Sequence, residues 1–283
     1  MNPTTERAPT WGADPYADAL RSGRGPLFLR RPDGWLLPLD VERWCARADA
    51  ADRSALRRCE GTVLDIGCGP GRLVAALAAQ GRQALGIDVS EAAVARTAAA
   101  GGTALCRSVF DSLPEEGSWG TALLLDGNIG IGGDCRALLR RTAELLAPHG
   151  LLIVETVPAD VDERVQVQVA GGHGHQGGLF PWARVGTPAL LRHAAATGWT
   201  PAERWCGTGP PAPADQRPGA ERRFVALRRR TRTTEARTRT ALPRSRGAAQ
   251  RPSSNSADAA NSTAVTSSQR ERKTPPGSPV ASV

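Results

Sequence analysis

The chain has 283 residues, of which 40% are hydrophobic and only 4% aromatic, which is sufficient for one large or two small domains with an aliphatic core. Its net charge of +8 is concentrated in residues 231–283, where nine basic side chains face three acidic ones and give a net charge of +6. The remainder is nearly neutral, so the high isoelectric point does not indicate nucleic-acid binding, and we expect none for the folded part.

The first 26 residues contain Pro, Gly and charged side chains throughout and predict a poorly ordered beginning of the chain. They include no apolar run of the length that a secretory signal needs. No later segment approaches the roughly 18 consecutive apolar residues of a membrane span. The six cysteines are scattered without a Cys-x-x-Cys pair, so we expect reduced thiols. These features predict a cytoplasmic protein with no membrane partner.

Residues 27–59 predict a small accessory element before the main fold. Two short apolar runs flank a Pro-Asp-Gly turn, which predicts a hairpin or a folded lid. Apolar residues at helical spacing follow and predict one or two helices. Trp35 lies in the first part and Trp44 in the second, so a folded lid could carry both over a site. We expect residues 1–60 to form an N-terminal extension and cap.

From residue 62 onwards, short apolar runs alternate with segments of helical periodicity. Such alternation is typical of an α/β fold in which helices cover both faces of a parallel sheet. The apolar runs are continuous, as expected for strands that are buried on both faces. The expected strands are residues 62–66, 84–88, 104–106, 121–126 and 151–156, and the expected helices are residues 72–80, 91–100 and 135–146.

The pattern then changes. Residues 161–170 alternate between apolar and polar side chains and predict a strand with one wetter face. A loop rich in Gly and His follows, and residues 187–197 predict a helix that ends before a glycine. Residues 199–206 and 224–227 predict the last two strands.

Apolar periodicity disappears beyond residue 230, where Thr, Ser, Arg, Ala and Pro dominate. Such a segment buries too little apolar surface to offset the entropy of ordering, so residues 231–283 are predicted to be a disordered basic tail. The main domain is then expected to comprise residues 61–230. The heavy use of Ala, Arg and Gly, with a single Lys, indicates a GC-rich bacterial genome.

A glycine-rich turn joins the strand expected at residues 62–66 to the next helix, with the sequence Gly-Cys-Gly-Pro-Gly at residues 67–71. Glycine accepts positive φ angles and lets a ligand approach the backbone closely. Asp88 ends the next strand, 17 residues after the last glycine, where Rossmann-like folds place a carboxylate for ribose hydroxyls. The turn differs from the dinucleotide pattern Gly-x-Gly-x-x-Gly, because Asp65 precedes it and Pro70 lies within it.

With these features, residues 63–71 resemble the signature of class I S-adenosylmethionine-dependent methyltransferases. The resemblance covers residues 62–227 as a fold and is specific only over the turn and Asp88. It implies a Rossmann-like three-layer sandwich whose seven-stranded, mostly parallel sheet has an antiparallel last strand. It also implies that S-adenosylmethionine is the co-substrate.

The resemblance assigns contacts with the co-substrate residue by residue. The glycines would let it lie across the turn, Asp65 would position its methionine portion and Asp88 would hold the ribose hydroxyls. The family often has an acid that contacts the adenine amino group, but here Val109 and Phe110 are expected to flank the ring, with Asp111 as a turn residue. The expected cofactor-binding residues are Asp65, Gly67, Cys68, Gly69, Gly71, Asp88, Val89, Val109, Phe110 and Asp126.

In this fold the acceptor meets the sulfonium beyond the fourth strand of the sheet. Asp126 could contact the methionine amine, orient the acceptor or only end the strand, and Asn128 could orient the acceptor or have a structural role. His173 and His175 are candidate catalytic bases in a Gly-rich loop beside an aromatic wall and Arg184, or they belong to an inert surface loop. No carboxylate or Cys follows them at ligand spacing, so we expect no metal.

These features predict a methyltransferase that acts on a small-molecule acceptor. Methyl transfer is an in-line displacement, so the protein must orient the nucleophile and, for an O or N acceptor, remove a proton. The sequence Asn-Pro-Pro-Tyr, associated with amino methylation of adenine or glutamine, does not occur, which disfavours nucleic-acid bases. Three alternatives remain: a protein or rRNA methyltransferase that docks through the basic tail, a non-catalytic S-adenosylmethionine-binding protein, and an NAD-dependent oxidoreductase.

Overall fold

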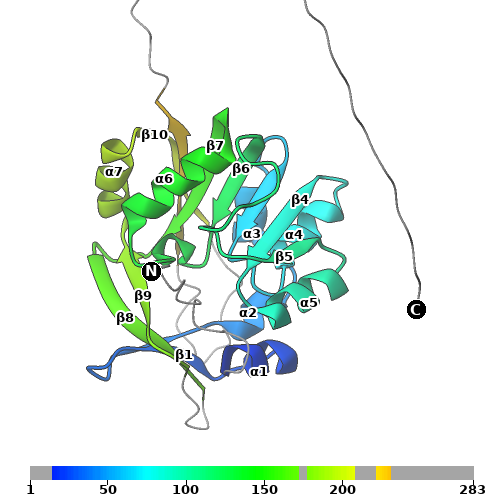
Figure 1. The fold of residues 1–283 in the computed structure, drawn as a ribbon, viewed down its shortest axis with the longest axis vertical. Coiled ribbons are helices and arrows are strands. Elements are labelled where there is room, and N and C mark those ends of the chain that lie inside the picture. Colours follow the sequence, from blue (N-terminus) through cyan, green and yellow to red (C-terminus); the bar gives the residue numbers. More distant parts are fainter. Residues whose placement is uncertain (1–14, 172–176, 208–220, 231–283) are drawn as a thin grey trace, which may run out of the picture. The chain divides into compact units, whose positions relative to one another are not determined.

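The computed structural model of the protein describes residues 15–171, 177–207 and 221–230, and a seven-stranded sheet lies at its centre (Figure 1). The strands lie in the order β10 (Trp199–Gly207), β11 (Arg222–Arg229), β7 (Leu146–Thr156), β6 (Trp119–Leu124), β3 (Val63–Ile66), β4 (Ala84–Asp88) and β5 (Ala104–Cys106). The five strands from β7 to β5 are parallel, whereas β11 is antiparallel to both of its neighbours. This confirms the expected seven-stranded sheet with an antiparallel last strand.

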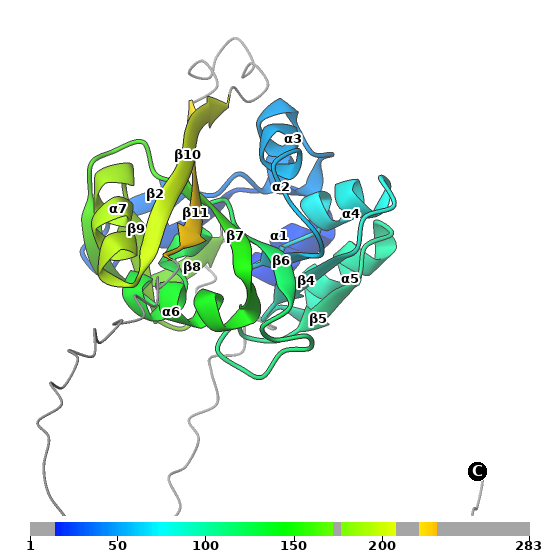
Figure 2. The same cartoon turned by 90° about the horizontal axis from the view of Figure 1, so that it is seen from above.

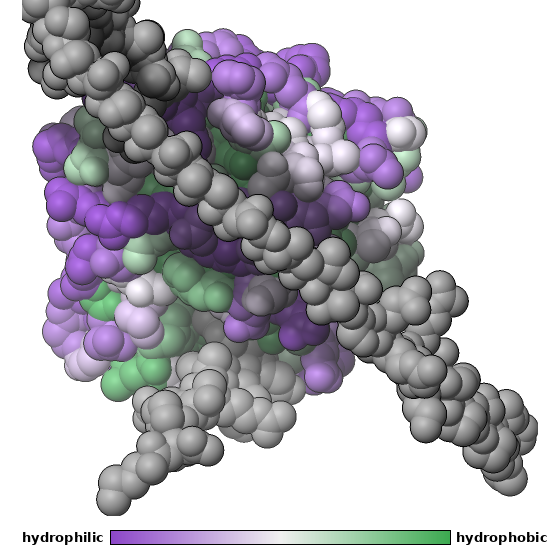
Figure 3. All heavy atoms as spheres, turned by 45° about the horizontal axis from the view of Figure 1, so that its top comes forward, coloured by the Kyte–Doolittle hydropathy of each residue, from purple (hydrophilic) through white to green (hydrophobic). Residues whose placement is uncertain are grey.

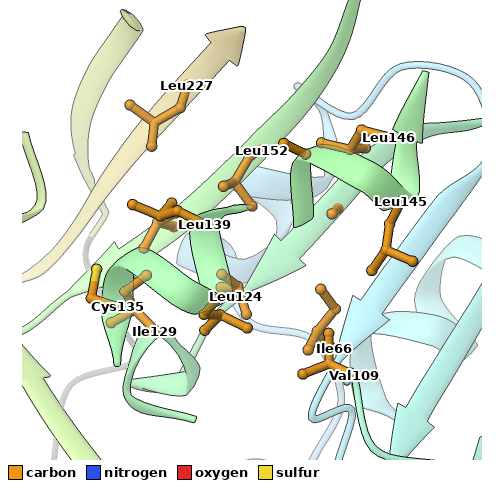
Figure 4. Packing of buried hydrophobic residues seen from close by; sticks show 14 of the residues in the cluster. Ile66, Val109, Leu124, Ile129, Cys135, Leu139, Leu145, Leu146, Leu152 and Leu227 are labelled. Carbon is orange, nitrogen blue, oxygen red and sulfur yellow. The ribbon is translucent and has the colours of Figure 1, made fainter. Parts of the chain in front are cut away.

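Helices cover both faces of this sheet (Figure 2). Successive residues of a strand point to opposite faces, so Leu123 and Ile153 pack with α3 and α4, while Leu124 and Leu152 pack with α6 and α7. Figure 4 shows Leu139 of α6 close to the second pair. This two-sided burial explains the continuous apolar runs. The helices are α3 (Ala50–Leu56), α4 (Arg72–Ala78), α5 (Glu91–Ala99), α6 (Cys135–Leu145) and α7 (Thr187–Ala196).

The order of the strands reverses between β3 and β6. The chain builds the sheet outwards from β3 through β4 to β5, and then returns to add β6 on the other side of β3. In open α/β sheets, ligands bind outside the carboxyl ends of the strands at such a point. Gly67 follows β3 there, and Asp126 lies two residues after β6. The topology therefore places the candidate site at these two segments.

A second sheet of four strands lies at the lower end of Figure 1 and is not predicted by the sequence. In it, β1 from the N-terminal part pairs with β8, so the expected hairpin and the expected strand of residues 161–170 belong to one sheet. Two helices pack against it around Val41 and Val167. These elements are α1 (Pro15–Ser22), β1 (Leu27–Arg30), β2 (Leu36–Pro38), α2 (Val41–Cys45), β8 (Asp162–Gly171) and β9 (Phe180–Val185).

Two of these elements differ from the expectation. α1 is a regular helix inside the segment that composition predicts to be poorly ordered, and its Leu20 is fully buried. β9 forms from the segment expected only as an aromatic wall. Its Pro181 is compatible with a strand because β9 is an edge of the small sheet, where a missing N–H donor is tolerated. The expected tail, residues 231–283, lies outside the described residues.

Exposed apolar side chains are few on the described part of the chain. On the face shown in Figure 3, hydrophilic side chains predominate and hydrophobic ones form separate patches. The described large hydrophobic residues with exposed side chains are Leu36, Val89, Leu105, Phe110 and Leu179. Val89 and Phe110, which follow β4 and β5, return below as part of the candidate site. No helix among the described residues has the length and apolar character needed to cross a membrane.

Candidate functional site

The glycine-rich turn connects β3 to α4 in a conformation that requires glycine. Gly67, Gly69 and Gly71 have φ angles of +72°, +54° and +83°, which residues other than glycine rarely adopt. A Cβ on Gly71 would also lie 2.4 Å from Oγ1 of Thr97 on α5, so this glycine is needed for packing. A Cβ on Gly69 would lie 3.5 Å from the hydroxyl of Tyr16, which shows that α1 lies over the turn.

Asp88 ties the end of β4 to this turn. Its Oδ2 accepts a hydrogen bond of 2.9 Å from the backbone N–H of Gly69, and its Oδ1 accepts one of 2.9 Å from Ser90. Burial raises the pKa of Asp88 to about 6, although these backbone donors oppose the shift. A carboxylate oxygen can accept a second hydrogen bond. Asp88 can therefore hold the turn and still bind two ligand hydroxyls.

Asp65 lies in β3, two residues before the turn, and its side chain is 1% exposed. Its Oδ2 is buried without a hydrogen-bond partner. Burial raises the pKa of Asp65 to about 7, although the positive charge of Arg72 opposes the shift. An unpartnered buried carboxylate oxygen is costly. A ligand that brought a cationic donor to this oxygen would remove that cost.

Asp126 is surrounded by arginines. Its Oδ1 accepts a hydrogen bond of 2.7 Å from Nη2 of Arg43 on α2, and its Oδ2 accepts one of 2.7 Å from Nη1 of Arg72 on α4. Burial would raise the pKa of Asp126, but the charges of Arg72, Arg43 and Arg222 outweigh it and hold the pKa well below its usual value. Asp126 therefore stays ionised, and its carboxylate is engaged in this network.

Two donors on α2 lie in the same region without a partner. Nη1 of Arg43 and Nε1 of Trp44 are both buried, and neither donates a hydrogen bond. Arg43 is joined to the site through Asp126, and the ring of Trp44 lies 6.4 Å from that of Tyr16, edge to face. Unpartnered buried donors therefore lie on α2, and an unpartnered buried acceptor, Oδ2 of Asp65, lies on β3 of the main sheet.

Asn128 supports the turn from the segment after β6. It opens the 3-10 turn η2 (Asn128–Gly130), and its Nδ2 donates hydrogen bonds of 2.9 Å to the carbonyl oxygens of Ile66 and Gly67. A Cβ on Gly67 would lie 2.6 Å from this Nδ2, so the amide packs directly on the turn. The structural role left open by the sequence is thus present in the structure.

We expect Asn128→Ala to weaken binding of S-adenosylhomocysteine about tenfold, because two hydrogen bonds that fix the turn are lost at about 0.5–1.5 kcal/mol each. Calorimetry measures this effect directly. Asn128→Asp, which cannot donate to either carbonyl, is the matched variant and should weaken binding at least as much. Unchanged binding, with only the acceptor KM raised, would instead show that Asn128 orients the acceptor.

The expected adenine residues lie in different surroundings. Val109 is 3% exposed and packs in the core beside α6 (Figure 4), whereas Phe110 is 46% exposed. Val89 is also exposed, directly after Asp88. Asp111 accepts a hydrogen bond from the N–H of Ser108, as expected of a turn residue. Phe110 and Val89 are therefore available to a planar ligand, and Val109 supports them from behind.

The expected acceptor region lies against β9. Ile131 forms a β-bridge with Trp182, and a Cβ on Gly130 would lie 2.6 Å from Nε1 of this Trp. His173 and His175 lie outside the described residues. Among the described residues, no three His, Cys, Asp or Glu side chains gather as a metal site. Cys68 is buried and its Sγ contacts Thr97 at 3.8 Å, inside the turn.

Sequence reasoning predicted the turn, Asp65 and Asp88 as site residues, but did not single out Tyr16, Arg43 or Arg72. Arg43 and Arg72 looked like ordinary polar positions of short helices. Tyr16 lies in a segment that was expected to be poorly ordered. The sequence held one signal for this network of charges. Arg72, directly after the turn, is the charged first residue of α4, whose other residues are apolar. It is only 6% exposed.

Comparison with protein families gives one match. The model described as a methyltransferase domain matches residues 39–184, which is about half of the chain and includes the turn, Asp88 and Asp126. A search of curated proteins found no significant match.

Comparison with solved structures gives many matches of the same fold. A methyltransferase from Bacteroides fragilis, solved in complex with S-adenosyl-L-homocysteine, is 20% identical with a TM-score of 0.60, and the match covers 76% of this chain and 93% of that one. A structure described for the conversion of a disulfide bond into a thioacetal group during echinomycin biosynthesis is 18% identical with a TM-score of 0.51, covering 77% and 91%. At this identity the matches show the fold.

Proposed function

This chain belongs to the S-adenosylmethionine-dependent methyltransferases of the class I fold, and we propose that it methylates a small molecule at the carboxyl ends of β3 and β6. The observation that carries the placement is the unpartnered Oδ2 of Asp65, buried beside the glycine turn. Asp88 on β4 and Arg43 on α2 would supply further groups that bind the co-substrate.

The methionine end of the co-substrate is a zwitterion, and the site offers a complement to each charge. Oδ2 of Asp65 is an unpartnered acceptor for the ammonium group. Nη1 of Arg43 and Nε1 of Trp44 are unpartnered donors for the carboxylate. Asp126 lies between the two sides, because it binds Arg43 and also raises the pKa of Asp65. We propose that Asp126 positions Arg43 and does not itself touch the acceptor.

The other end of the co-substrate is an adenosine. Asp88 would accept hydrogen bonds from both ribose hydroxyls, while the glycines of the turn leave room for the chain that joins ribose to sulfur. Val89 and Phe110 would cover the faces of the adenine ring, which would bury apolar surface that is exposed in the free protein. Cys68, inside the turn, would contribute only its backbone.

S-adenosylmethionine supplies a methyl group on a positively charged sulfur, so the protein's part is to orient the acceptor and exclude water. β9 and the segment after β6 form the wall on which we place the acceptor. A small molecule fits the nearly neutral folded part better than a nucleic acid does. His173 and His175 stay our candidates for a base that takes the acceptor's proton.

Binding of S-adenosylhomocysteine is expected to strengthen by about a hundredfold between pH 5.5 and pH 8, since an ionisation that binding requires contributes up to tenfold per pH unit below its pKa. Burial raises the pKa of Asp65 to about 7 and that of Asp88 to about 6, so both are partly protonated in the free protein at pH 6. The bound ammonium and ribose hydroxyls favour the carboxylates, so binding releases protons. Calorimetry in buffers of different ionisation enthalpy measures this release.

Asp65→Asn is the matched control, because an amide cannot titrate. It should bind S-adenosylhomocysteine more weakly at pH 8 and lose most of the dependence on pH.

Binding of NAD in place of S-adenosylhomocysteine would overturn the proposed function. Tight binding with no turnover on any acceptor would favour a non-catalytic binding protein, and equal activity after removal of residues 231–283 would exclude docking through the tail.

A further inference from the structure

Arg184 of β9 holds an unused hydrogen-bond donor in a fixed position. Its Nη1 donates a hydrogen bond of 2.9 Å to Oε2 of Glu163 on the neighbouring strand, and its guanidinium lies 4.7 Å from the centre of the Trp35 ring. Its Nε is buried without a partner. These two contacts orient the guanidinium, and its Nε–H is available to donate a hydrogen bond to a ligand.

Trp182 lies two residues earlier on the same strand and therefore on the same face of the small sheet. The register agrees, because Trp182 is opposite Val165 and Arg184 is opposite Glu163 on β8. The Phe180 ring meets the Trp182 ring edge to face at 6.1 Å and 88°, which fixes its orientation. Trp182 is only half-buried, although it packs with the apolar cluster under the small sheet.

This face adjoins the segment where the acceptor is expected. Trp182 forms a β-bridge with Ile131, directly after η2. Gly130 has no room for a side chain, since a Cβ there would lie 2.2 Å from the carbonyl oxygen of Ala183 and 2.6 Å from Nε1 of Trp182. The indole is thus pressed against the segment that follows β6. Residues of β9 are therefore in place to bind an acceptor at the carboxyl end of β6.

From this geometry we propose that the acceptor is a planar aromatic or heteroaromatic molecule that carries a carbonyl or carboxylate oxygen. Its ring lies on Trp182, and its oxygen accepts a hydrogen bond from Nε of Arg184. This inference rests on the proposed function, because it identifies the acceptor of that reaction. Side chains at positions i and i+2 of a strand are about 6.6–6.8 Å apart, the length of one ring with an oxygen substituent.

The charges of the site indicate which part of the acceptor Arg184 recognises. Arg184 is paired with Glu163, so the pair is neutral and the free Nε–H selects an acceptor oxygen. A cationic ammonium group has no lone pair to accept this hydrogen bond. A saturated ring would lose the stacking on Trp182. An aromatic molecule without such an oxygen would leave the buried Nε–H unpartnered.

The experiment uses the full chain and titrates five probes by calorimetry, with and without S-adenosylhomocysteine. 4-Hydroxybenzoate and 4-hydroxybenzamide have a ring and the required oxygen. 4-Methylphenol lacks the carbonyl or carboxylate oxygen, cyclohexanecarboxylate lacks the aromatic ring, and 4-hydroxybenzylamine carries a cationic group in place of that oxygen. We expect the first two to bind at least about tenfold more tightly than 4-methylphenol and 4-hydroxybenzylamine, the loss expected for one unmade hydrogen bond to a charged donor. They should also bind more tightly than cyclohexanecarboxylate, which loses the stacking on Trp182.

Three variants connect this preference to the residues. Arg184→Lys keeps the positive charge for Glu163 but removes the Nε–H, and should weaken binding of 4-hydroxybenzoate about tenfold while leaving 4-methylphenol unchanged. Trp182→Ala should weaken every aromatic probe, and Trp182→Phe should restore most of the affinity. Affinity for S-adenosylhomocysteine should stay unchanged in all of them, which shows that the variants are folded.

The outcomes separate this inference from the proposed function. If neither oxygen-bearing aromatic probe binds at millimolar concentration, or if Arg184→Lys leaves the binding of 4-hydroxybenzoate unchanged, the inference is overturned. The proposed function still stands in that case, provided that S-adenosylhomocysteine binds. If S-adenosylhomocysteine does not bind but the probes do, the proposed function fails, and the aromatic site on β9 is retained as a binding site.

Discussion

Asp88→Ala is expected to weaken binding of S-adenosylhomocysteine by at least about a hundredfold at pH 8. Two ribose hydroxyls lose a charged acceptor, and hydrogen bonds to charged groups contribute about 1.5–3 kcal/mol each, or about tenfold or more in affinity. The backbone N–H of Gly69 also loses its acceptor, which loosens the turn. Calorimetry gives the dissociation constant, and thermal melting followed by circular dichroism shows whether the variant is folded.

Asp111→Ala is the matched control for this prediction. Asp111 is an exposed acid that accepts a hydrogen bond from Ser108 within a turn, and we place it outside the co-substrate site. Its replacement should change the affinity less than threefold, as for surface changes of about 0.5 kcal/mol. A folded Asp88→Ala variant with an affinity as high as that of Asp111→Ala would remove Asp88 from the ribose site.

The part of the fold that could be predicted is the part with local signals. β6 and β7 are buried on both faces, so runs such as Leu123 to Leu125 are apolar throughout. In the helices between the strands, apolar residues recur at helical spacing. Asp65 and Asp88 could be found because each stands at a fixed distance from the glycine turn along the chain. Both the sheet and the sheet side of the site therefore follow from sequence.

The contacts of the expected cap could not be predicted, because they join distant segments. Arg43 and Asp126 are 83 residues apart, and Tyr16 and Gly69 are brought together only by the packing of α1. The small sheet joins β1 to β8, which are separated by most of the main domain. No local pattern reports such pairing, so the sequence predicts a hairpin and a single strand where the structure has one sheet.

Strand β9, on which we place the acceptor, was also difficult to predict from its own sequence. β9 contains Pro181 and begins shortly after a Gly-rich loop, both of which weaken a strand prediction. Its alternation of Phe180, Trp182 and Arg184 is a period of two, but it spans only six residues. Three such residues are compatible with a loop as well as with an edge strand. The aromatic wall was thus recognised by composition and placed only by the structure.

Arg72→Met is expected to lower the free energy of unfolding by about 3–5 kcal/mol at pH 7, the cost of removing one partner from buried ion pairs. Arg72 is buried and donates to both oxygens of Asp52, which is fully buried, at 2.8 and 2.9 Å. It also donates to Asp126. Met fills a similar volume but supplies no donor, so both carboxylates are left to Arg43 and Arg222. Urea denaturation followed by circular dichroism measures the change.

Two comparisons test that the loss is electrostatic and local. Arg228→Met removes an exposed pair with Glu60 and should cost less than about 1 kcal/mol. Burial opposes ionisation of Asp52, but Arg72 and Arg222 outweigh it and lower its pKa to about 2, so its contribution is present above pH 4 and lost as pH falls. The gap between wild type and Arg72→Met should therefore narrow by about 1–2 kcal/mol at pH 3. A gap that stays constant with pH would mean that Arg72 stabilises the protein through packing and not through its charge.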